Sequence, residues 1–349
     1  MTRPTVDVSS LHHVDEFEAI ARSVLPPDIY GYVAGGAGTE RTVARNRLAL
    51  DRMLLLPRVM RDMRTIDTRT TVLGSTVDHP LLLAPSAMQR LAHPEGEIAT
   101  ARAARDRGLV MVLSMNSSTT VEEVCAVGSE CWMQLYVSND RGHVETIVER
   151  AVGAGVRALC VTVDHAGMPT RLRELERPLV IPPDLHFVHL AADLSGRGVD
   201  RSFDWKSLDW LRGISDIPIV LKGVLHPEDA RIAVDSGVDG IVVSNHGGRQ
   251  LDGAVAPYDV LPAVLDIVGD SAEVYADGGI RSGSDLLKVL ALGARAGLIG
   301  RPVWWGLATA GEEGVGRVLD IILDDFTEAM RLCGVRDIHE VSRDLLWSG

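Results

Sequence analysis

Residues 240–252 read Gly-Ile-Val-Val-Ser-Asn-His-Gly-Gly-Arg-Gln-Leu-Asp, an apolar run that passes directly into a polar turn. An uninterrupted apolar run of this kind is typical of a strand buried on both faces. The turn contains His246, which can exchange a proton near neutral pH, and Arg249, which can bind a carboxylate through two parallel hydrogen bonds. A base and an anion-binding group three residues apart favour an acidic small-molecule substrate. The alternative is an ordinary polar loop at a strand end.

The unit that leads into this stretch recurs along the chain. Helix 227–236 leads through Gly237 into the apolar strand, and helix 284–292 leads through Gly293 into another. Glycine just past a helix is the usual left-handed cap. Further helices are predicted at 95–107 and 142–152. The pattern predicts eight strands, at 81–84, 110–113, 132–136, 158–163, 218–222, 240–244, 273–277 and 297–300.

Eight strand–helix units predict an α/β fold, a (β/α)8 TIM barrel at 81–312, with an open doubly wound sheet as the alternative. Helices expected at 14–25 and 39–53 form an N-terminal helical segment, 14–54, and a closing C-terminal helix is expected at 313–333. A long loop follows the fourth strand, and such an insertion usually serves as a lid or binding loop. Because no linker or low-complexity tract divides residues 1–349, we expect one domain.

Composition narrows the possible partners. The net charge of −13 argues against general electrostatic binding of nucleic acid. No run reaches the roughly 18 apolar residues of a membrane span, and Met1–Thr5 lacks the apolar core of a signal peptide. The four cysteines have no metal-ligand spacing. We therefore expect a cytoplasmic protein without a metal, with Cys131 and Cys160 as buried free thiols.

The loops after the seventh and eighth strands contain features of a phosphate site. They supply Asp277-Gly278-Gly279-Ile280-Arg281 and Gly300-Arg301-Pro302. Glycine lets a backbone approach a ligand closely, and these two loops commonly bind phosphate in TIM barrels. The alternative is a glycine-rich turn with solvated arginines.

Two further charged residues end buried strands. Lys222 ends the fifth strand and needs a partner there, for which a heterocycle that becomes anionic would serve. Asp164 follows the fourth strand and could orient His246 and support its protonated form, as the third member of a triad does. Helix capping or loop solvation is the alternative for Asp164.

Taken in order, these motifs resemble the FMN-dependent L-2-hydroxy acid oxidases and dehydrogenases, which include glycolate oxidase, lactate oxidase and the mandelate-oxidising and 4-hydroxymandelate-oxidising enzymes. The resemblance spans residues 14–345. It rests on the runs Ala84–Gln89, His93–Glu97, Gln134–Tyr136, Thr162–Asp164, Leu221–Val224, Ser244–Asp252, Asp277–Arg281 and Ile299–Pro302.

The resemblance implies an FMN-dependent oxidation of an (S)-2-hydroxy acid to the 2-oxo acid, with O2 reoxidising the flavin to give H2O2, and a homotetramer. It implies that His246 is the base, that Asp164 holds it, and that Tyr136 binds the substrate hydroxyl. It assigns the substrate carboxylate to Tyr32, Arg171 and Arg249, and places Lys222 beside the N1/C2 edge of the flavin. The implied cofactor-binding set is Ser86, Ala87, Ser114, Gln134, Thr162, Lys222, Ser244, Asp277, Gly279, Arg281, Gly300 and Arg301.

The sequence departs from the family pattern near the expected substrate. Asn116 and Ser138 stand where an aromatic or bulky residue is usual, which suggests a substrate side chain larger than that of lactate, such as that of an aromatic, mandelate-type acid. Residues 165–171 read His-Ala-Gly-Met-Pro-Thr-Arg, and the proline constrains how Arg171 reaches the pocket. This altered segment motivates one alternative, the same flavin barrel performing different chemistry such as oxidative decarboxylation.

A quinone-linked dehydrogenase and a barrel without turnover are also compatible with these motifs. The dehydrogenase is disfavoured because residues 165–215 contain no evident membrane-binding insertion. A flavin- or phosphate-binding barrel without turnover is disfavoured because both His246 and Arg249 are present.

Overall fold

The computed structural model describes residues 6–189 and 200–347. Met1–Thr5 and the Gly196-Arg197-Gly198 part of the long loop therefore lie outside the described residues. Within the described ranges, no helix combines the length and the apolar composition needed to cross a membrane.

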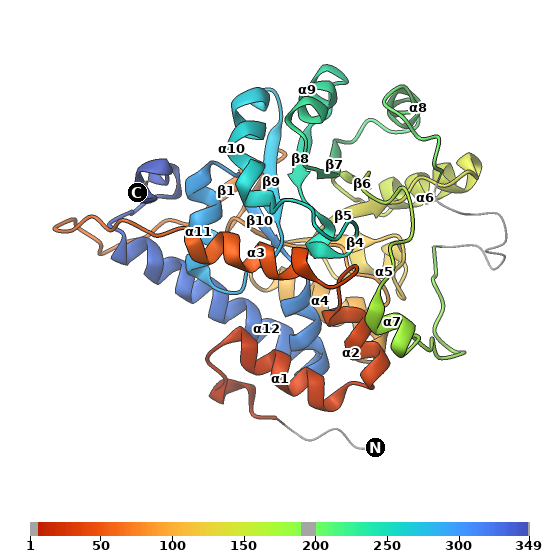
Figure 1. The fold of residues 1–349 in the computed structure, drawn as a ribbon, viewed down its shortest axis with the longest axis horizontal. Helices are drawn as coiled ribbons and strands as arrows, with labels where there is room; N and C mark the ends of the chain where they lie inside the picture. Colours follow the sequence, from red (N-terminus) through yellow and green to blue (C-terminus); the bar gives the residue numbers. More distant parts are fainter. Residues whose placement is uncertain (1–5, 190–199, 348–349) are drawn as a thin grey trace.

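Eight parallel strands close a barrel in the order β10-β3-β4-β5-β6-β7-β8-β9 (Figure 1). The predicted (β/α)8 barrel is confirmed, because an open sheet would leave β3 and β10 unpaired, whereas Leu82 pairs with Leu298. The strands are β3 Leu81–Leu83, β4 Val110–Ser114, β5 Glu130–Leu135, β6 Leu159–Thr162, β7 Ile219–Val224, β8 Gly240–Val243, β9 Glu273–Asp277 and β10 Ala296–Ile299.

Helices connect these strands and cover the outside of the barrel (Figure 1). Most lie close to their predicted positions, and the loop after β6 contains two additional short helices, α7 and α8. The bounds are α4 Gly96–Arg105, α5 Val121–Cys125, α6 Arg141–Gly153, α7 Leu172–Glu176, α8 Ser207–Gly213, α9 Pro227–Asp235, α10 Pro257–Val268 and α11 Gly283–Leu292.

The closing helix begins earlier than predicted. Instead of starting at residue 313, α12 spans Arg301–Leu332 and starts directly after β10, with a break in helical geometry at Ala310 and Gly311. Pro302 in the first turn starts this helix readily, whereas the sequence pattern marks only its second half. The start of α12 thus lies at the carboxyl end of β10, where it can contribute to a site.

The N-terminal helical segment contains three helices rather than the two predicted. They are α1 Val14–Val24, α2 Pro27–Ala34 and α3 Arg41–Arg52. The proline pair at 26–27 ends α1, but Pro27 also occupies the first turn of α2, where its missing N–H costs nothing. α1 packs against α12, and α2 brings Tyr32 to the mouth of the barrel.

A short hairpin that the sequence analysis did not predict, β1 Thr70–Val72 and β2 Ser75–Val77, lies against the amino-terminal end of the barrel. The backbone amide of Leu73 donates to both carboxylate oxygens of Glu273, at 3.2 and 3.1 Å. Val72 and Val77 join the cluster of side chains that fills the barrel, including Trp132 and Tyr275. This end is therefore packed shut, and the opposite end is available for a site.

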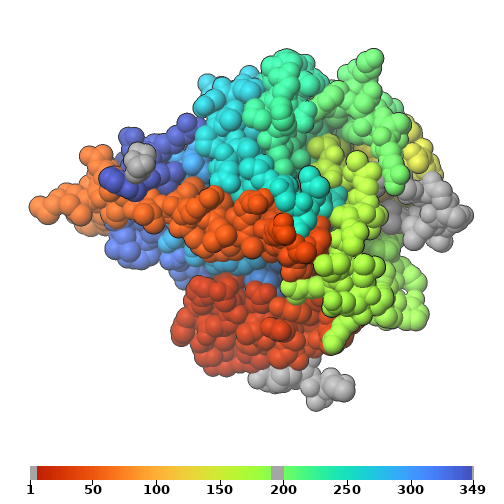
Figure 2. All heavy atoms as spheres, viewed as in Figure 1, coloured from red at the N-terminus to blue at the C-terminus, as the bar shows by residue number. Residues whose placement is uncertain are grey.

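Residues 54–60 project from the body of the molecule (Figure 2). Val59 is 80% exposed and Met60 fully exposed, and Leu54 and Leu56 on the same segment are also exposed. Large apolar side chains gathered on one projecting segment are typical of a surface that contacts another protein.

Candidate active site

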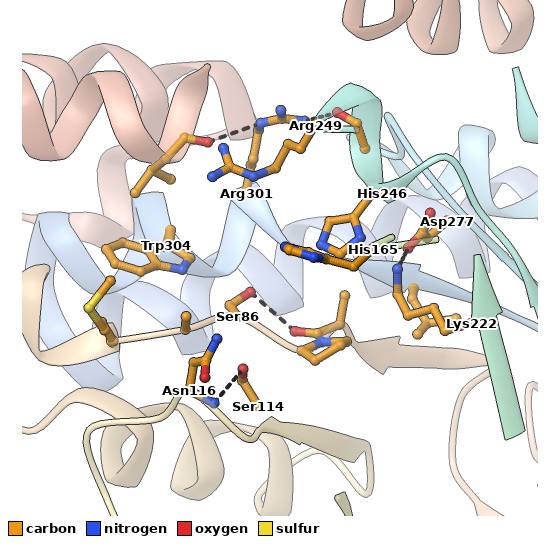
Figure 3. A pocket seen from close by; sticks show the side chains of 18 of the residues that line it. Ser86, Ser114, Asn116, His165, Lys222, His246, Arg249, Asp277, Arg301 and Trp304 are labelled. Carbon is orange, nitrogen blue, oxygen red and sulfur yellow. Dashed lines mark hydrogen bonds and ion pairs between the residues drawn. The ribbon is translucent and has the colours of Figure 1, made fainter. Parts of the chain in front are cut away.

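A pocket of about 470 Å³ opens at the carboxyl ends of the barrel strands (Figure 3). Residues from the carboxyl ends of all eight strands, or from the loops that follow them, line it together with Tyr32 and Val33 of α2. Its volume and position are those of a small-molecule site in a TIM barrel. The residues that the sequence placed at separate strand ends therefore meet around one cavity.

His246 and Asp164 form a hydrogen bond in this pocket. Nδ1 of His246 lies 2.9 Å from Oδ1 of Asp164. The backbone amide of His246 donates to Oγ of Ser244 at 2.9 Å, and this bond helps to hold His246 at a φ of +58°, a strained conformation typical of functional sites. Although burial opposes ionisation, the imidazole of His246 lowers the pKa of Asp164. The carboxylate therefore holds the Nδ1 proton and leaves Nε2 as the basic nitrogen.

The approach of Asp164 to His246 depends on Gly223. A Cβ at Gly223 would lie 2.6 Å from Cβ of Asp164, and the φ of Gly223 is +109°, so a side chain is excluded on both counts. Nε2 of Gln250 donates to the backbone carbonyl of Asp164 at 2.8 Å. The position of the aspartate is thus set by β7, through Gly223, and by the segment after β8, through His246 and Gln250.

Arg249 is half-buried and pairs with no carboxylate of the described residues. Its Nη1 donates to the backbone carbonyls of Tyr32, at 2.5 Å, and Gly35, at 3.0 Å, and its guanidinium lies 4.9 Å from the centre of the Tyr32 ring. Burial lowers the pKa of Arg249. Because a partly buried cation without an anion is costly, this arginine is suited to bind the carboxylate of a ligand.

Arg171 also reaches the pocket, in spite of Pro169 in the preceding segment. The backbone amide of Gly38 donates to the carbonyl of Thr170 at 2.8 Å and so fixes this segment. Nη1 of Arg171 lies 3.0 Å from Oε1 of Glu174, while its Nε is buried without a partner. Arg171 can donate to a ligand, but Glu174 already balances its charge.

Tyr136 follows β5 and lines the same cavity. Burial, helped by the carboxylate of Asp164, raises the pKa of Tyr136 above its ordinary value. Its hydroxyl therefore stays protonated and available as a hydrogen-bond donor.

Lys222 has a partner, as the sequence required. Its Nζ lies 2.8 Å from Oδ2 of Asp277 and donates to Oγ of Ser244 at 3.0 Å. Burial disfavours the ammonium, but the ion pair with Asp277 outweighs it and raises the pKa of Lys222. The second oxygen of Asp277, Oδ1, is buried without a partner. A buried acceptor left open in this way is suited to a ligand hydroxyl.

A row of polar side chains crosses the ends of β4, β5 and β6. Oγ of Ser114 donates to Oε1 of Gln134 at 3.2 Å, and Nε2 of Gln134 donates to Oγ1 of Thr162 at 3.0 Å. These buried groups are mutually satisfied and so hold a defined orientation. They can present polar atoms to a flat heterocycle.

Arg281 and Arg301 are half-buried and line the same pocket. Burial lowers the pKa of Arg281 to about 10 and that of Arg301, which is also near Arg249 and Arg281, to about 9. Arg301 donates to the carbonyls of Val33, Gly35 and Gly247 and, like Arg281, forms no ion pair with a carboxylate of the described residues. Both cations lie beside the N-terminus of α12, where backbone amides favour an anion. This end of the pocket fits a phosphate group.

The structure therefore brings the predicted residues together, but not all of them border the cavity. Four of the predicted residues do not line the cavity and instead hydrogen-bond to residues that do, or to each other: Gln134, Thr162, Asp164 and Ser244. The remaining predicted residues line it: Tyr32, Ser86, Ala87, Ser114, Tyr136, Arg171, Lys222, His246, Arg249, Asp277, Gly279, Arg281, Gly300 and Arg301. Among the described residues, no three His, Cys, Asp or Glu side chains are grouped so as to hold a metal ion.

Sequence reasoning missed several lining residues, namely His143, His165, Met168, Glu174 and Phe187. In the sequence, His165 and Met168 stand out only as part of the altered segment. His143 in α6, Glu174 in α7 and Phe187 after α7 belong to no motif. The backbone carbonyls of Val33 and Gly35, which accept hydrogen bonds from Arg249 and Arg301, leave no signal in a sequence.

Fold and site together define a barrel oxidoreductase that binds a phosphate-bearing heterocyclic cofactor beside a carboxylate substrate. Comparison with known proteins agrees: a family described as FMN-dependent dehydrogenase matches residues 21–348. An L-lactate oxidase from Nostoc sp. is 42% identical, with 97% of this chain and 99% of that protein covered. A 4-hydroxymandelate oxidase from Amycolatopsis orientalis is 43% identical, with 94% and 96% covered.

Solved structures agree with the sequence comparisons. A crystal structure of mandelate oxidase with 3,3-difluoro-2-hydroxy-3-phenylpropionic acid superposes with a TM-score of 0.90 at 43% identity, covering 95% of this chain and 98% of that one. This chain belongs to the FMN-dependent dehydrogenase family and, within it, to the 2-hydroxy acid oxidases. Its cofactor is FMN.

The residues of the pocket fit that cofactor. Among the described residues, Arg281 and Arg301 have no carboxylate partner, Lys222 pairs with Asp277, and the Oδ1 atom of Asp277 has no donor. A phosphate, an electron-poor ring and a ribityl hydroxyl would satisfy these three requirements respectively. Asp277, which the resemblance places in the cofactor-binding set, forms an ion pair with Lys222.

Proposed function

We propose that this protein oxidises an (S)-2-hydroxy acid to the corresponding 2-oxo acid, with O2 as the final electron acceptor and H2O2 as its product. The observation that supports this most directly is one pocket containing both an aspartate-held histidine and a half-buried arginine that pairs with no carboxylate of the described residues. A 2-hydroxy acid needs both, because its carboxylate must be anchored while a proton leaves the adjacent carbon or its hydroxyl.

Each residue then has a distinct task. Arg249 binds the substrate carboxylate, with Arg171 and Tyr32 beside it. Tyr136 donates a hydrogen bond to the substrate hydroxyl, because its own proton is retained. Nε2 of His246 accepts the proton that is lost, and Asp164 stabilises the resulting imidazolium. The same histidine can act as the base whether the proton leaves the hydroxyl oxygen or the α-carbon of the substrate.

FMN supplies the two-electron acceptor that no side chain here provides. We propose that Arg281, Arg301, Gly279 and Gly300 hold its phosphate, and that Lys222 stabilises negative charge on its ring. Ser86, Ala87 and Ser114 would border the ring, with Gln134 and Thr162 fixing Ser114 from behind. Ser244 would hold Lys222 through the 3.0 Å bond to its Nζ.

We propose a substrate larger than lactate, with an aromatic, mandelate-type side chain. Asn116 and Ser138 leave space where bulkier residues are usual in the family, and Phe187 and Met168 offer apolar surface. Relatives named for mandelate and 4-hydroxymandelate support this choice, although a relative named for lactate is about equally similar.

The test is a visible spectrum of the purified protein, repeated without oxygen after adding (S)-mandelate, (S)-lactate and glycolate in turn. We expect the flavin absorbance to bleach fastest with (S)-mandelate, and equimolar H2O2 and 2-oxo acid to form once air is admitted. Bleaching by none of the acids would contradict the proposed reaction.

Altered chemistry is the second candidate, favoured by the unusual segment 165–170, which places His165 in the pocket. Its signature is loss of CO2 from the substrate while O2 is consumed. A quinone-linked dehydrogenase would instead reduce a quinone faster than O2 in the same assay.

We further propose that residues 1–349 form one domain and that the protein is a homotetramer. The exposed apolar side chains of 54–60 support an interface between copies, and the packing of α1 and α4 on α12 supports a single unfolding unit. A thermal melt of the FMN-loaded protein with two separate transitions would contradict the single domain. Light scattering after size exclusion tests the tetramer.

A further inference from the structure

His165 is a second histidine in the pocket, beside the proposed base. The centre of its ring lies 4.9 Å from that of Tyr136 and 6.4 Å from that of His246. Figure 3 shows it next to His246 and away from Arg249. No role in the proposed reaction uses this residue.

One ring nitrogen of His165 lacks a hydrogen-bond partner. Nδ1 is buried and has no hydrogen-bond partner of good geometry among the described residues, and the same holds for Nε2 of His143, which also lines the pocket. Buried polar atoms are nearly always satisfied. Two unsatisfied imidazole nitrogens on the wall of one cavity therefore indicate a polar group that arrives with the ligand.

The wall that contains them is made by the segments that follow three neighbouring strands. Asn116 lies after β4, Ser138 after β5, His143 in the first turn of α6, and His165 after β6. These strands are adjacent in the barrel, so the segments after them form one side of the pocket. We refer to these four residues as the neutral wall.

The neutral wall suits an uncharged group better than an anion. Burial lowers the pKa of His165, and the neighbouring His246 lowers it further, so its imidazole is neutral at physiological pH. The nearby cation, Arg171, is already paired with Glu174 at 3.0 Å. A second carboxylate would find no unpaired cation here, whereas a hydroxyl can both donate to and accept from a neutral imidazole.

The neutral wall borders apolar surface. Phe187 and Met168 line the same cavity on the segment that follows β6. An aromatic ring packed on this surface would have its edge near the imidazoles. The combination matches a ring that bears a hydroxyl.

We propose that the neutral wall, with His165 as its principal residue, selects 2-hydroxy acids whose side chain is a hydroxyphenyl group over those with an unsubstituted phenyl group. This inference rests on the proposed oxidation of a 2-hydroxy acid and specifies its substrate class. His165 is on this view a specificity-determining residue, not the base.

The test measures binding separately from turnover. Phenylacetate, 3-hydroxyphenylacetate and 4-hydroxyphenylacetate lack the 2-hydroxyl, so their dissociation constants can be obtained from the change in the flavin spectrum on titration. We expect the FMN-loaded protein to bind one hydroxy isomer at least about tenfold more tightly than phenylacetate, because an unpaired buried polar group disfavours the analogue that lacks its partner.

Variants then assign the preference. His165→Phe keeps an aromatic ring against Tyr136. In this variant we expect the dissociation constants of phenylacetate and of the preferred hydroxy isomer to differ by less than about threefold, because only the hydroxyl partner is lost. Binding of phenylacetate itself should be unchanged. His165→Gln should retain part of the preference. His186→Phe, the same change at a histidine of the same loop outside the pocket, should leave the ratio intact.

Two results would overturn the inference: equal or tighter binding of phenylacetate by the parent protein, or an equal loss for all three acids in His165→Phe, which would indicate a structural role. Anaerobic mixing with (S)-mandelate and its hydroxy derivatives separates the two proposals. Reduction without preference refutes only the neutral wall, whereas preference in binding without any reduction refutes the proposed oxidation.

Discussion

The two sides of the pocket differ in how their charges are balanced. After β8, β9 and β10 come the half-buried cations Arg249, Arg281 and Arg301, none of them paired with a carboxylate of the described residues. After β4, β5 and β6 comes the neutral wall, and the cation beside it, Arg171, is paired with Glu174. The first side therefore requires anions from its ligands, while the second accepts uncharged groups. On the proposed function, this difference would set the direction in which a hydroxy acid lies.

The largest effect should follow from removing the base between the two sides. We expect His246→Ala to retain FMN but to slow anaerobic flavin reduction by about 10²- to 10⁴-fold, the usual contribution of a general base. Stopped-flow spectroscopy measures this rate. Reduction at the parent rate would remove His246 from the mechanism.

Breaking the ion pair between Lys222 and Asp277 tests how much the balance of these two charges contributes to stability. Lys222→Met leaves the carboxylate of Asp277 buried and alone, which we expect to lower the free energy of unfolding by about 3–5 kcal/mol. Urea titration of the FMN-loaded protein measures it. The double variant Lys222→Met with Asp277→Leu should recover part of the loss, and no recovery would argue against the pair as its cause.

Variants of Arg249 and Arg171 test whether a cation that has no carboxylate partner among the described residues binds the substrate more strongly than one that has a partner. Arg249→Met should weaken binding of a 2-oxo acid by about 1.5–3 kcal/mol, the value of a charged hydrogen bond. Arg171→Met should cost less, because Glu174 already neutralises that guanidinium. Inhibition constants settle the order, and a larger loss at Arg171 would reverse the assignment.

The last prediction concerns stability rather than turnover, at a histidine near the neutral wall. His189 accepts a hydrogen bond from the backbone amide of Val121 at 2.9 Å and contacts Oγ of Ser117 at 3.1 Å. Burial lowers the pKa of His189 from 6.5 to about 4. The unfolded chain therefore binds the proton first, so the contribution of His189 to stability should be constant above pH 6.5 and fall as the pH drops toward 4.

Comparison of the parent with His189→Gln isolates that contribution from the carboxylates that also titrate in this range. Urea unfolding at two pH values, one on either side of the ordinary histidine pKa, should show a steeper loss of stability in the parent. Equal slopes in the two proteins would mean that His189 does not contribute.

Most of the fold could be predicted because its signals are local. Each buried strand is a continuous apolar run, and Gly237 and Gly293 mark helix ends within a few residues of the next strand. The hairpin β1–β2 was missed because its strands have three residues each, too few to show a period. The start of α12 was missed because the helix follows β10 without a loop.

The site was predictable in part, for a different reason. Motif residues such as His246 and Arg301 could be assigned because they directly follow strands. His165 follows a strand as well, but its neutrality and its unsatisfied nitrogen depend on the packing of His246 and Tyr136 around it. The pairing of Arg171 with Glu174 likewise depends on a local geometry that the spacing alone does not reveal.

The sequence by itself determined the eight strand–helix units, the side chains delivered at each strand end, and hence the family and the need for FMN. Only the tertiary structure decided which of those side chains meet. Closure of the barrel brings Asp164 to His246 across 82 positions, and the folding of α2 over the mouth brings the carbonyl of Gly35 to Arg249 across 214. Local patterns encode elements, whereas charge balance and hydrogen-bond satisfaction belong to groups that become neighbours only when the chain has closed on itself.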